Sequence, residues 1–482
     1  MDAYSIEISE STEYDDFMPY PAEPLRPSMP FIVASTLFGL TAALAYFLDQ
    51  TIAAALVFGI WVFIVATISP RVGVVIALTI QVWDVVFNPE IGGAFVWISP
   101  GRVLTAWCIV AYLRYLLWRR PNITSVKKSI IMFFVFVLWA LVSVIWADYK
   151  LRGLWVVTKI FLQVPLLIVA VDLLSGRKVL EQTFILIIIG SVTGGIYSMV
   201  GGIAVRAESD VRMELAGALV NELSHSLGTA IMVGFALLIL RKSIMAAILA
   251  FVGGAAMFLV TLRAGTRGMI LYIPASIFFG LLIAYWRQAH KIIFVGITGT
   301  LIFAFSMYWA VQSGFISGWL QERMLGTFGT DWIKNNLRLQ LWQEAIGIAM
   351  RHPLGVGAGG ERAVYIAEGT AKTFYAHNIF LSILIEYNII GLGIFLAALM
   401  FLVRGLLRIR DPALRCGAGM ILCFCLLVGM KMTAHESRLF WQPIMLTMMM
   451  IETDYRERQM EIQEGLNYEQ TADIDEQEVY QA

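Results

Sequence analysis

The sequence predicts an all-α membrane protein whose chain crosses the bilayer many times in one helical bundle. Of its 482 residues, 59% are hydrophobic and only 15% are charged, and the mean hydropathy is +0.75. Soluble globular chains are roughly 45–50% apolar and about 25% charged, so the composition excludes that class. Apolar runs of about 17–25 residues recur along the chain, and each is long enough to span a bilayer.

Apolar windows predict about 12–14 spans, and fourteen candidates can be placed, at roughly the following positions. They are residues 31–48, 52–68, 72–87, 103–118, 130–146, 154–171, 184–202, 227–240, 244–262, 269–286, 292–311, 379–403, 417–430 and 439–451. The third and the last are the weakest. Gln81 and Asp84 interrupt the third.

Basic residues in the predicted short loops give the orientation, because cytoplasmic loops are enriched in Lys and Arg. Those on one face are Arg71, Arg114, Arg119, Arg120, Lys127, Lys128, Arg177, Lys178, Arg241, Lys242, Arg287, Lys291, Arg404, Arg408, Arg410, Arg415, Arg456 and Arg458. We predict that this face is cytoplasmic and that both termini lie on it. The acidic ends, residues 1–30 and 452–482, are predicted to be disordered cytoplasmic tails on either side of a transmembrane domain spanning residues 31–451.

The opposite face contains a long predicted loop, residues 312–376, and loops of this length are usually functional when they are ordered. Asn335 or Asn336 can cap a helix that runs to about Met350. Trp342 lies on an apolar stripe of this helix, which is therefore expected to lie against the membrane surface or the bundle.

The outer face should be poor in arginine, yet several arginines fall on it. They are Arg206, Arg212, Arg263, Arg267, Arg338 and Arg362. A cation at the membrane edge usually has a partner, and guanidinium groups bind phosphate oxygens in bidentate fashion. An anionic ligand is one interpretation; snorkelling, or salt bridges to nearby carboxylates such as Glu208 and Glu222, is the other.

Arg267 and His377 are the strongest candidates for chemistry. Arg267 lies at the outer mouth of a span, beside glycines that let backbone or ligand approach closely. His377 opens a span, where the positive end of the helix dipole disfavours its protonated form. A neutral imidazole is what a general base requires; the alternative is that His377 only caps the helix.

The string Gly355-Val-Gly-Ala-Gly-Gly360 matches the dinucleotide-binding fingerprint in letters alone. No strand precedes it and no βαβ unit surrounds it, so this interpretation fails. Turns that present the loop are the expected structure.

Three segments of the outer face resemble the O-antigen ligase and polymerase superfamily, whose members build or transfer lipid-linked glycans outside the inner membrane. Thr266-Arg-Gly-Met269 is similar to the family's element of small residues plus Arg at a span entrance. Residues 336–342 and 352–357 resemble its Arg, Trp and Pro-x-x-Gly-x-Gly sequence. His377-Asn378, followed by a helix that contains Glu386, is the third.

The resemblance has limits. A weaker fourth similarity runs from Arg212 to Asn221, and the remaining N-terminal half matches only as a series of apolar spans. Pro353 and Gly355 are one residue closer to each other than the proline and first glycine of the family pattern. Asn388 stands where members often have glycine, which raises the question of how the helix packs there.

The resemblance implies a GT-C-like, inverting membrane glycosyltransferase that uses no metal, other cofactor or nucleotide sugar. Its donor would be a glycan on undecaprenyl diphosphate at the periplasmic face of the bacterial inner membrane. Arg267 and Arg338 would bind the diphosphate, with Arg212 in support, and His377 would be the general base. The supporting residues would be Asn378, Trp342 and Glu386.

The acceptor distinguishes the members of this superfamily. A polymerase, which we favour, extends a lipid-linked repeat; a ligase transfers the glycan to lipid A core or to protein. The expected partners are therefore lipid-linked glycan, an acceptor glycan, membrane lipid and a chain-length regulator protein, but no nucleic acid. A secondary transporter is the alternative from another class, although the polar residues lie at the outer edge rather than at the midplane. A peptidoglycan polymerase of the shape, elongation and division family also uses lipid diphosphate donors, but has fewer spans.

Overall fold

The structure is a computed structural model and is a bundle of α-helices. It describes residues 51–83, 100–117, 120–200, 205–207, 210–212, 220–241, 243–263, 267–294, 296–298, 305, 309, 337–368, 375–432 and 435–481. Within these residues, seven helices are long and apolar enough to cross a membrane. The prediction of a polytopic helical membrane protein is therefore confirmed, and a short hairpin of β1 (Val205–Ala207) and β2 (Asp210–Arg212) is added to it.

The seven long helices agree with predicted spans. They are α6 (Lys127–Ser143, continued by η3, Val144–Trp146), α7 (Lys150–Leu174), α8 (Arg177–Val200), α9 (Val220–Arg241), α10 (Ile244–Arg263), α16 (Ile379–Leu407) and α17 (Pro412–Gly429). The other elements are α2 (Thr51–Ile68), α3 (Pro70–Thr79), α5 (Pro100–Leu116), α11 (Arg267–Ala284), η4 (Trp286–Gln288), α14 (Leu337–Arg351), α15 (Glu361–Ala367) and α18 (Arg438–Gln481). Predicted span 31–48 and most of 292–311 lie outside the described residues, so about 12–14 spans stays a prediction.

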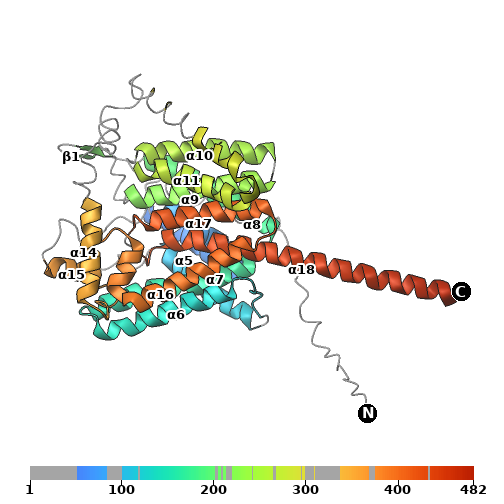
Figure 1. Cartoon of the computed structure of the whole chain (residues 1–482), viewed down its shortest axis with the longest axis horizontal. Helices are drawn as coiled ribbons and strands as arrows, with labels where there is room; N and C mark the ends of the chain where they lie inside the picture. The colour runs from blue at the N-terminus through green and yellow to red at the C-terminus, as the bar shows by residue number, and fades with distance from the viewer. Residues whose placement is uncertain are drawn as a thin grey trace, which may run out of the picture.

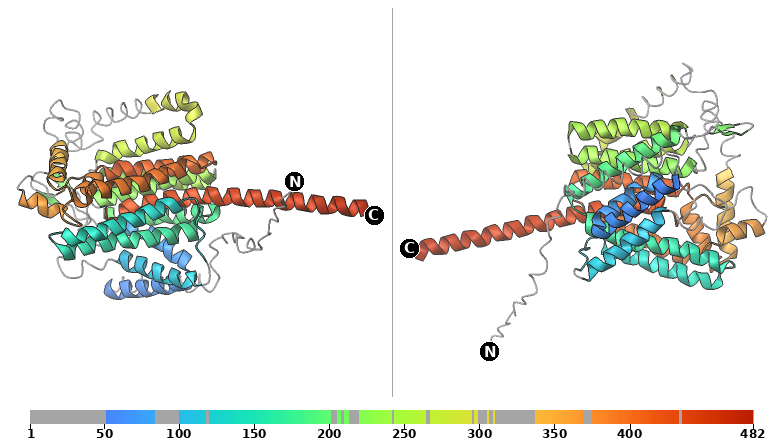
Figure 2. Two further views of the ribbon diagram at one scale, coloured as in Figure 1. Left: turned by 60° about the horizontal axis from the view of Figure 1, so that its bottom comes forward. Right: turned by 180° about the vertical axis from the view of Figure 1, so that it is seen from behind.

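The long helices lie side by side along one axis (Figure 1). Helix α17 lies inside the bundle, packed against α9, α11 and α18. Of the membrane-length windows, 83% of α9 is buried but only 28% of α10, whose Phe251 is 78% exposed. Helix α9 therefore belongs to the core and α10 has an apolar face suited to lipid. Helices α2, α3 and α5 pack together on one side (Figure 2).

The two ends of the bundle differ. Helices α14 and α15 lie at one end, which we call the loop end, together with the hairpin (Figure 1). Helix α18 projects from the opposite end, the tail end (Figures 1 and 2). The predicted topology requires this separation of long loop and C-terminus, while the assignment of the tail end to the cytoplasm stays a prediction.

The boundary predicted at residue 452 is wrong, because α18 continues through it to Gln481. Glu452 is fully buried and accepts the amides of Thr124 and Ser125 at 3.2 and 3.0 Å. The Asp454 carboxylate likewise accepts two amides of the loop after α16, at 3.0 and 2.9 Å. The charged composition of this segment predicted disorder. Here, however, two of its carboxylates accept backbone amides of the loops at the tail end. The N-terminal tail, residues 1–30, lies outside the described residues.

The predicted helix after Asn336 is confirmed as α14, although its expected apolar stripe is not the buried one. Leu341, Ala345 and Ile348 face inward, where they pack against α15, α16 and the segment before α16. Ile346 and Met350, which follow Trp342 at spacing four on the predicted stripe, are 47% and 74% exposed. The small side chain of Ala345 lets α14 approach its neighbours closely. A stripe defined by large apolar residues does not include it.

Helix α16 is broken at Asn388, whose backbone has φ 59° and ψ −168°. The break exposes three carbonyl groups that a continuous helix would use internally. Those of Ile385 and Glu386 accept the amides of Val356 and Gly357 at 2.9 and 3.0 Å, and that of Tyr387 accepts the Trp139 indole N–H at 2.9 Å. The glycine string is thus bound to α16 rather than to a nucleotide.

Candidate functional site

His377 lies at the loop end, in the turn that enters α16. Its φ is +49°, in the left-handed region, and its side chain is half-buried. The next residue, Asn378, caps the helix: its side-chain oxygen accepts the amides of Phe380 and Leu381 at 3.0 and 3.4 Å. The capping role considered for His377 therefore belongs to Asn378.

Burial lowers the pKa of His377, and the cationic side chains of Arg338 and Lys431 lower it further. Each of these effects disfavours the imidazolium ion. The neutral imidazole that the sequence predicts is therefore favoured. The sequence suggested only the helix N-terminus as its cause, and the structure adds the neighbouring cations.

Arg338 and the start of α11 approach each other at the same end. The Tyr272 hydroxyl of α11 is within hydrogen-bonding reach of Arg338 on α14. Arg267 begins α11, and a Cβ built on the adjacent Gly268 would lie 3.3 Å from the Lys431 ammonium. The elements that carry Arg267, Arg338 and His377 thus converge. The Arg267 side chain itself lies outside the described atoms.

Other predicted arginines are less well defined. Arg206 and Arg212 lie in the hairpin at the loop end, and their side chains are outside the described part of the chain. Arg362 is exposed on α15. Trp342 is half-buried on α14, and its indole N–H has no hydrogen-bond partner among the described residues.

Two residues at this site, Lys431 and His225, are not predicted from the sequence. Lys431 follows α17 and acts electrostatically on His377, as stated above. His225, near the start of α9, is 3% exposed, and neither ring nitrogen has a hydrogen-bond partner within the described residues. Lys431 and Arg338 are also the charged groups that act on His225. Lys431 could have been found as a basic residue at the outer end of a predicted span.

A second cluster of buried polar residues lies next to the His377 turn. Glu361 and Glu386 are 3% and 4% exposed, and the Glu361 amide donates to Glu386 Oε1 at 3.4 Å. His435 Nε2 lies 3.5 Å from Glu386 Oε2 and 2.8 Å from the Tyr387 hydroxyl. The predicted supporting residue Glu386 is therefore one member of a network that sequence spacing did not reveal.

Charges in this network are distributed unevenly. Burial, and then the proximity of Glu386, raises the pKa of Glu361 to about 8. Burial would also raise the pKa of Glu436, but His435 and Lys159 outweigh it and leave that pKa below its ordinary value. The Lys159 ammonium lies 3.6 Å from Glu436. Glu361 is thus a carboxyl that retains its proton near neutral pH, whereas Glu436 is ionised.

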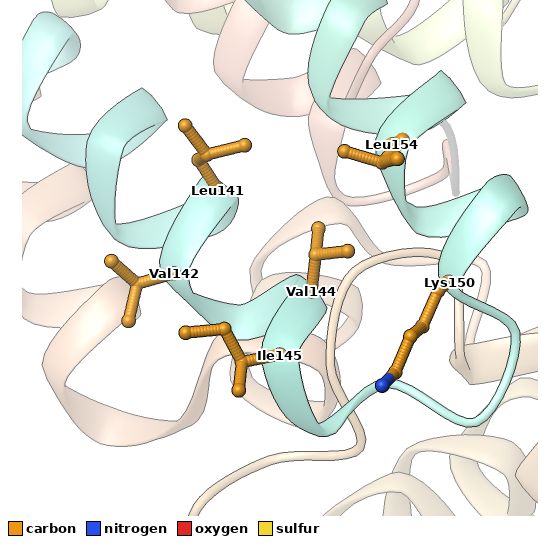
Figure 3. A pocket seen from close by; sticks show the side chains of 6 residues that line it. All are labelled: Leu141, Val142, Val144, Ile145, Lys150 and Leu154. Atoms are coloured by element: carbon orange, nitrogen blue, oxygen red, sulfur yellow. The ribbon is translucent and has the colours of Figure 1, made fainter.

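An open apolar hollow of about 420 Å³ lies at the surface where α6, η3 and α7 meet (Figure 3). Its lining is Leu141, Val142, Val144, Ile145, Lys150 and Leu154. None of the candidate site residues lines it, and Ile145 is 71% exposed. Its open shape and mainly apolar lining suit contact with lipid rather than with a polar substrate.

Residues 252–396 match the sequence model of a family described as O-antigen ligase. The match begins in α10 and ends in α16, so it contains Arg267, Arg338 and His377 but not Arg212, His225 or Lys431. The predicted resemblance to the O-antigen ligase and polymerase superfamily is thereby confirmed over this stretch. No curated protein sequence matches the chain.

Proposed function

We propose, from the match of residues 252–396 to the O-antigen ligase family, that this protein is a membrane glycosyltransferase. Its donor is a glycan repeat unit on undecaprenyl diphosphate, and it acts as a polysaccharide polymerase at the periplasmic face of the inner membrane. The observation that carries the proposal is the half-buried His377, whose pKa is lowered beside the cations Arg338 and Lys431. A neutral base next to cations suits a reaction that deprotonates an alcohol and expels a diphosphate.

In the proposed reaction His377 accepts the proton of an acceptor hydroxyl as its oxygen attacks the anomeric carbon. The new glycosidic C–O bond forms as the bond between that carbon and the phosphate oxygen breaks, which inverts the configuration. Undecaprenyl diphosphate leaves with the electron pair. Arg267 and Arg338 bind the diphosphate and stabilise its developing charge, with Arg212 in support.

Two of the proposed supporting residues hold the backbone around the His377 turn. Asn378 caps α16 directly after His377, and Glu386 contributes both its carbonyl and its carboxylate to the segments that surround the turn. Trp342 lies on α14, the helix that carries Arg338. The proposed reaction assigns charge stabilisation to guanidinium groups, and it requires no metal or other cofactor.

The second candidate function is a ligase, which the printed description of the matched family favours. The two enzymes share the donor and differ in the acceptor, which is a lipid-linked repeat for a polymerase and lipid A core or protein for a ligase. A polymerase would also be a partner for a chain-length regulator protein.

Glycan profiling of a deletion strain tests the proposal. The strain is complemented with wild type, His377→Ala or Arg267→Ala, with His290→Ala, an exposed histidine after η4, as the matched control. A polymerase predicts single repeat units in place of long polymer, restored by wild type and His290→Ala only. Long polymer that accumulates on its lipid carrier would identify a ligase. Full rescue by both site variants at normal protein levels would refute the site.

A further inference from the structure

The backbone of the turn that contains His377 is held from both sides. His377 has φ +49°, a conformation that non-glycine residues adopt only when their surroundings fix it. Asn378 fixes the following residues through its cap. On the preceding side, the Ala376 amide donates a 2.8 Å hydrogen bond to Glu361 Oε1.

Glu361 is an unusual partner for a backbone amide. It begins the short helix α15 and is 3% exposed, although Glu is rarely buried unless it is paired. The side chain of Ser382 on α16 is among the groups that act on the Glu361 carboxyl. Burial of a carboxyl group costs free energy unless the group is hydrogen-bonded. The hydrogen bond from the Ala376 amide is therefore part of what stabilises Glu361 in this buried position.

The groups that face Glu361 come from three elements. Glu386 and Ser382 belong to α16, Tyr365 belongs to α15 itself, and Glu436 acts from the loop between α17 and α18. His435, in the same loop, is close to Glu386. Glu361 retains its proton near neutral pH, as its pKa of about 8 indicates. A protonated carboxyl still has a carbonyl oxygen that accepts an amide N–H.

We propose that Glu361 is a positioning residue for His377: its side-chain oxygen holds the Ala376 amide and thereby directs the imidazole towards Arg338 and Lys431. The consequence for glycosyl transfer rests on the proposed function; the positioning itself does not. Glu361→Gln keeps a carbonyl oxygen at the same place and should preserve the turn. Glu361→Ala removes the acceptor, and Glu361→Asp withdraws it by one methylene.

Chemical modification of histidine tests the positioning without the reaction. The purified full-length protein in detergent is treated with diethyl pyrocarbonate, which modifies neutral imidazole, and each histidine is followed by mass spectrometry across a pH series. In Glu361→Ala and Glu361→Asp the His377 turn is released. We expect His377 to react about threefold faster or more, with its pH midpoint moved up towards the ordinary value for histidine. Glu361→Gln should behave as wild type.

Two internal comparisons make the result specific. His290, an exposed histidine after η4, is the internal comparison, and its reactivity should not change. Glu452→Ala is the matched variant, because Glu452 is an equally buried carboxylate that accepts backbone amides at the tail end. It should leave His377 reactivity unchanged. Unaltered His377 reactivity in Glu361→Ala, equal effects of Gln and Ala, or a parallel change at His290 would each overturn the proposal.

Transfer from a lipid-linked repeat unit by the same preparations gives the second readout. We expect about tenfold slower transfer in Glu361→Ala and near wild-type transfer in Glu361→Gln. A wild-type protein without transfer activity would refute the proposed function and leave the modification result valid. Normal transfer and normal His377 reactivity in Glu361→Ala would refute the positioning role alone.

Discussion

The amide of Gly357 donates a hydrogen bond to the carbonyl oxygen of Glu386 at 3.0 Å, inside the residues that form α16. In an unbroken helix that carbonyl would accept an amide four residues further on. The break at Asn388 therefore lets the glycine string pair with a membrane-length helix. Since α15, with Glu361, follows this string directly, the break also determines where the support for the His377 turn lies.

Asn388 should tolerate glycine and reject a β-branched residue. Its φ of 59° and ψ of −168° lie in a region adopted almost entirely by glycine. Its side-chain oxygen also accepts the Ile390 amide at 2.7 Å, as a helix cap does. We expect Asn388→Gly to lose less than about 1 kcal/mol of stability and Asn388→Val about 2–3 kcal/mol or more. Thermal unfolding in detergent measures both, and equal melting temperatures would contradict this interpretation of the break.

Gly355 should not accept even a methyl group. Its φ is +76°, and a Cβ there would lie 2.5 Å from the Glu386 carbonyl oxygen. Gly355→Ala should therefore separate the string from α16, lowering the melting temperature by several degrees and reducing transfer. Gly393→Ala is the matched control, since nothing lies within 4 Å of a Cβ built there. That change should be neutral or stabilising by about 0.5–1 kcal/mol; a comparable loss in both variants would show that the string is not tightly packed.

The sequence predicts the helices better than it predicts what the helices do at their ends. Apolar periodicity follows from burial and lipid contact, so the runs that become α6 to α10, α16 and α17 are visible in composition alone. Polar residues have no such pattern, because one buried carboxylate can cap a distant loop. Glu452 therefore resembled the start of a disordered tail, although it lies in the bundle and caps the loop at Thr124.

Residue type predicted some members of the candidate site, but separation along the sequence did not predict which residues meet there. The outer face is expected to be poor in arginine, so Arg267 and Arg338 are conspicuous there in the sequence alone. His377 is conspicuous because it is a titratable residue at the start of a predicted span. Lys431 and Glu361 acquire their roles from folding, which brings the end of α17 and the start of α15 to the His377 turn. A single lysine or glutamate in the sequence does not indicate which distant residue it will contact after folding.

The pH dependence of transfer should follow His377 and respond to Lys431. The neutral base fraction rises as pH rises through the pKa of His377, which burial, Arg338 and Lys431 hold below its ordinary value. The acidic limb of the rate profile should therefore lie below that of an ordinary histidine. Lys431→Gln removes one cation, so its limb should move to higher pH and transfer should slow several-fold in mild acid. Lys150→Gln, an exposed lysine at the start of α7, is the control; an unmoved limb in Lys431→Gln would separate Lys431 from the base.

Glu361→Gln should stabilise the protein, and more so as pH rises. Burial and Glu386 raise the pKa of Glu361 from 4.5 to about 8 in the folded chain. Between those values the unfolded chain has lost a proton that the folded chain retains, so wild-type stability falls with rising pH. Glutamine does not titrate and removes this part of the fall. Melting temperatures from about pH 5 to about pH 8 should diverge in favour of the variant; curves that stay parallel would mean that Glu361 ionises normally. The exposed Glu464→Gln is the control.

The first part of α18 beyond the membrane should be essential for stability and its distal part dispensable. Arg456 is 14% exposed at its side chain and donates to the carbonyl groups of Asp172 and Ser175 at 3.1 and 2.9 Å. Arg456→Ala leaves these groups and the Glu452 carboxylate without their cation, which should cost about 2–4 kcal/mol. Truncation after Glu461 removes a stretch whose described side chains are largely exposed, and should leave the melting temperature within a degree or so of wild type. A truncation as damaging as Arg456→Ala would mean that the distal helix also supports the bundle. Expression level and melting temperature in detergent decide between these outcomes.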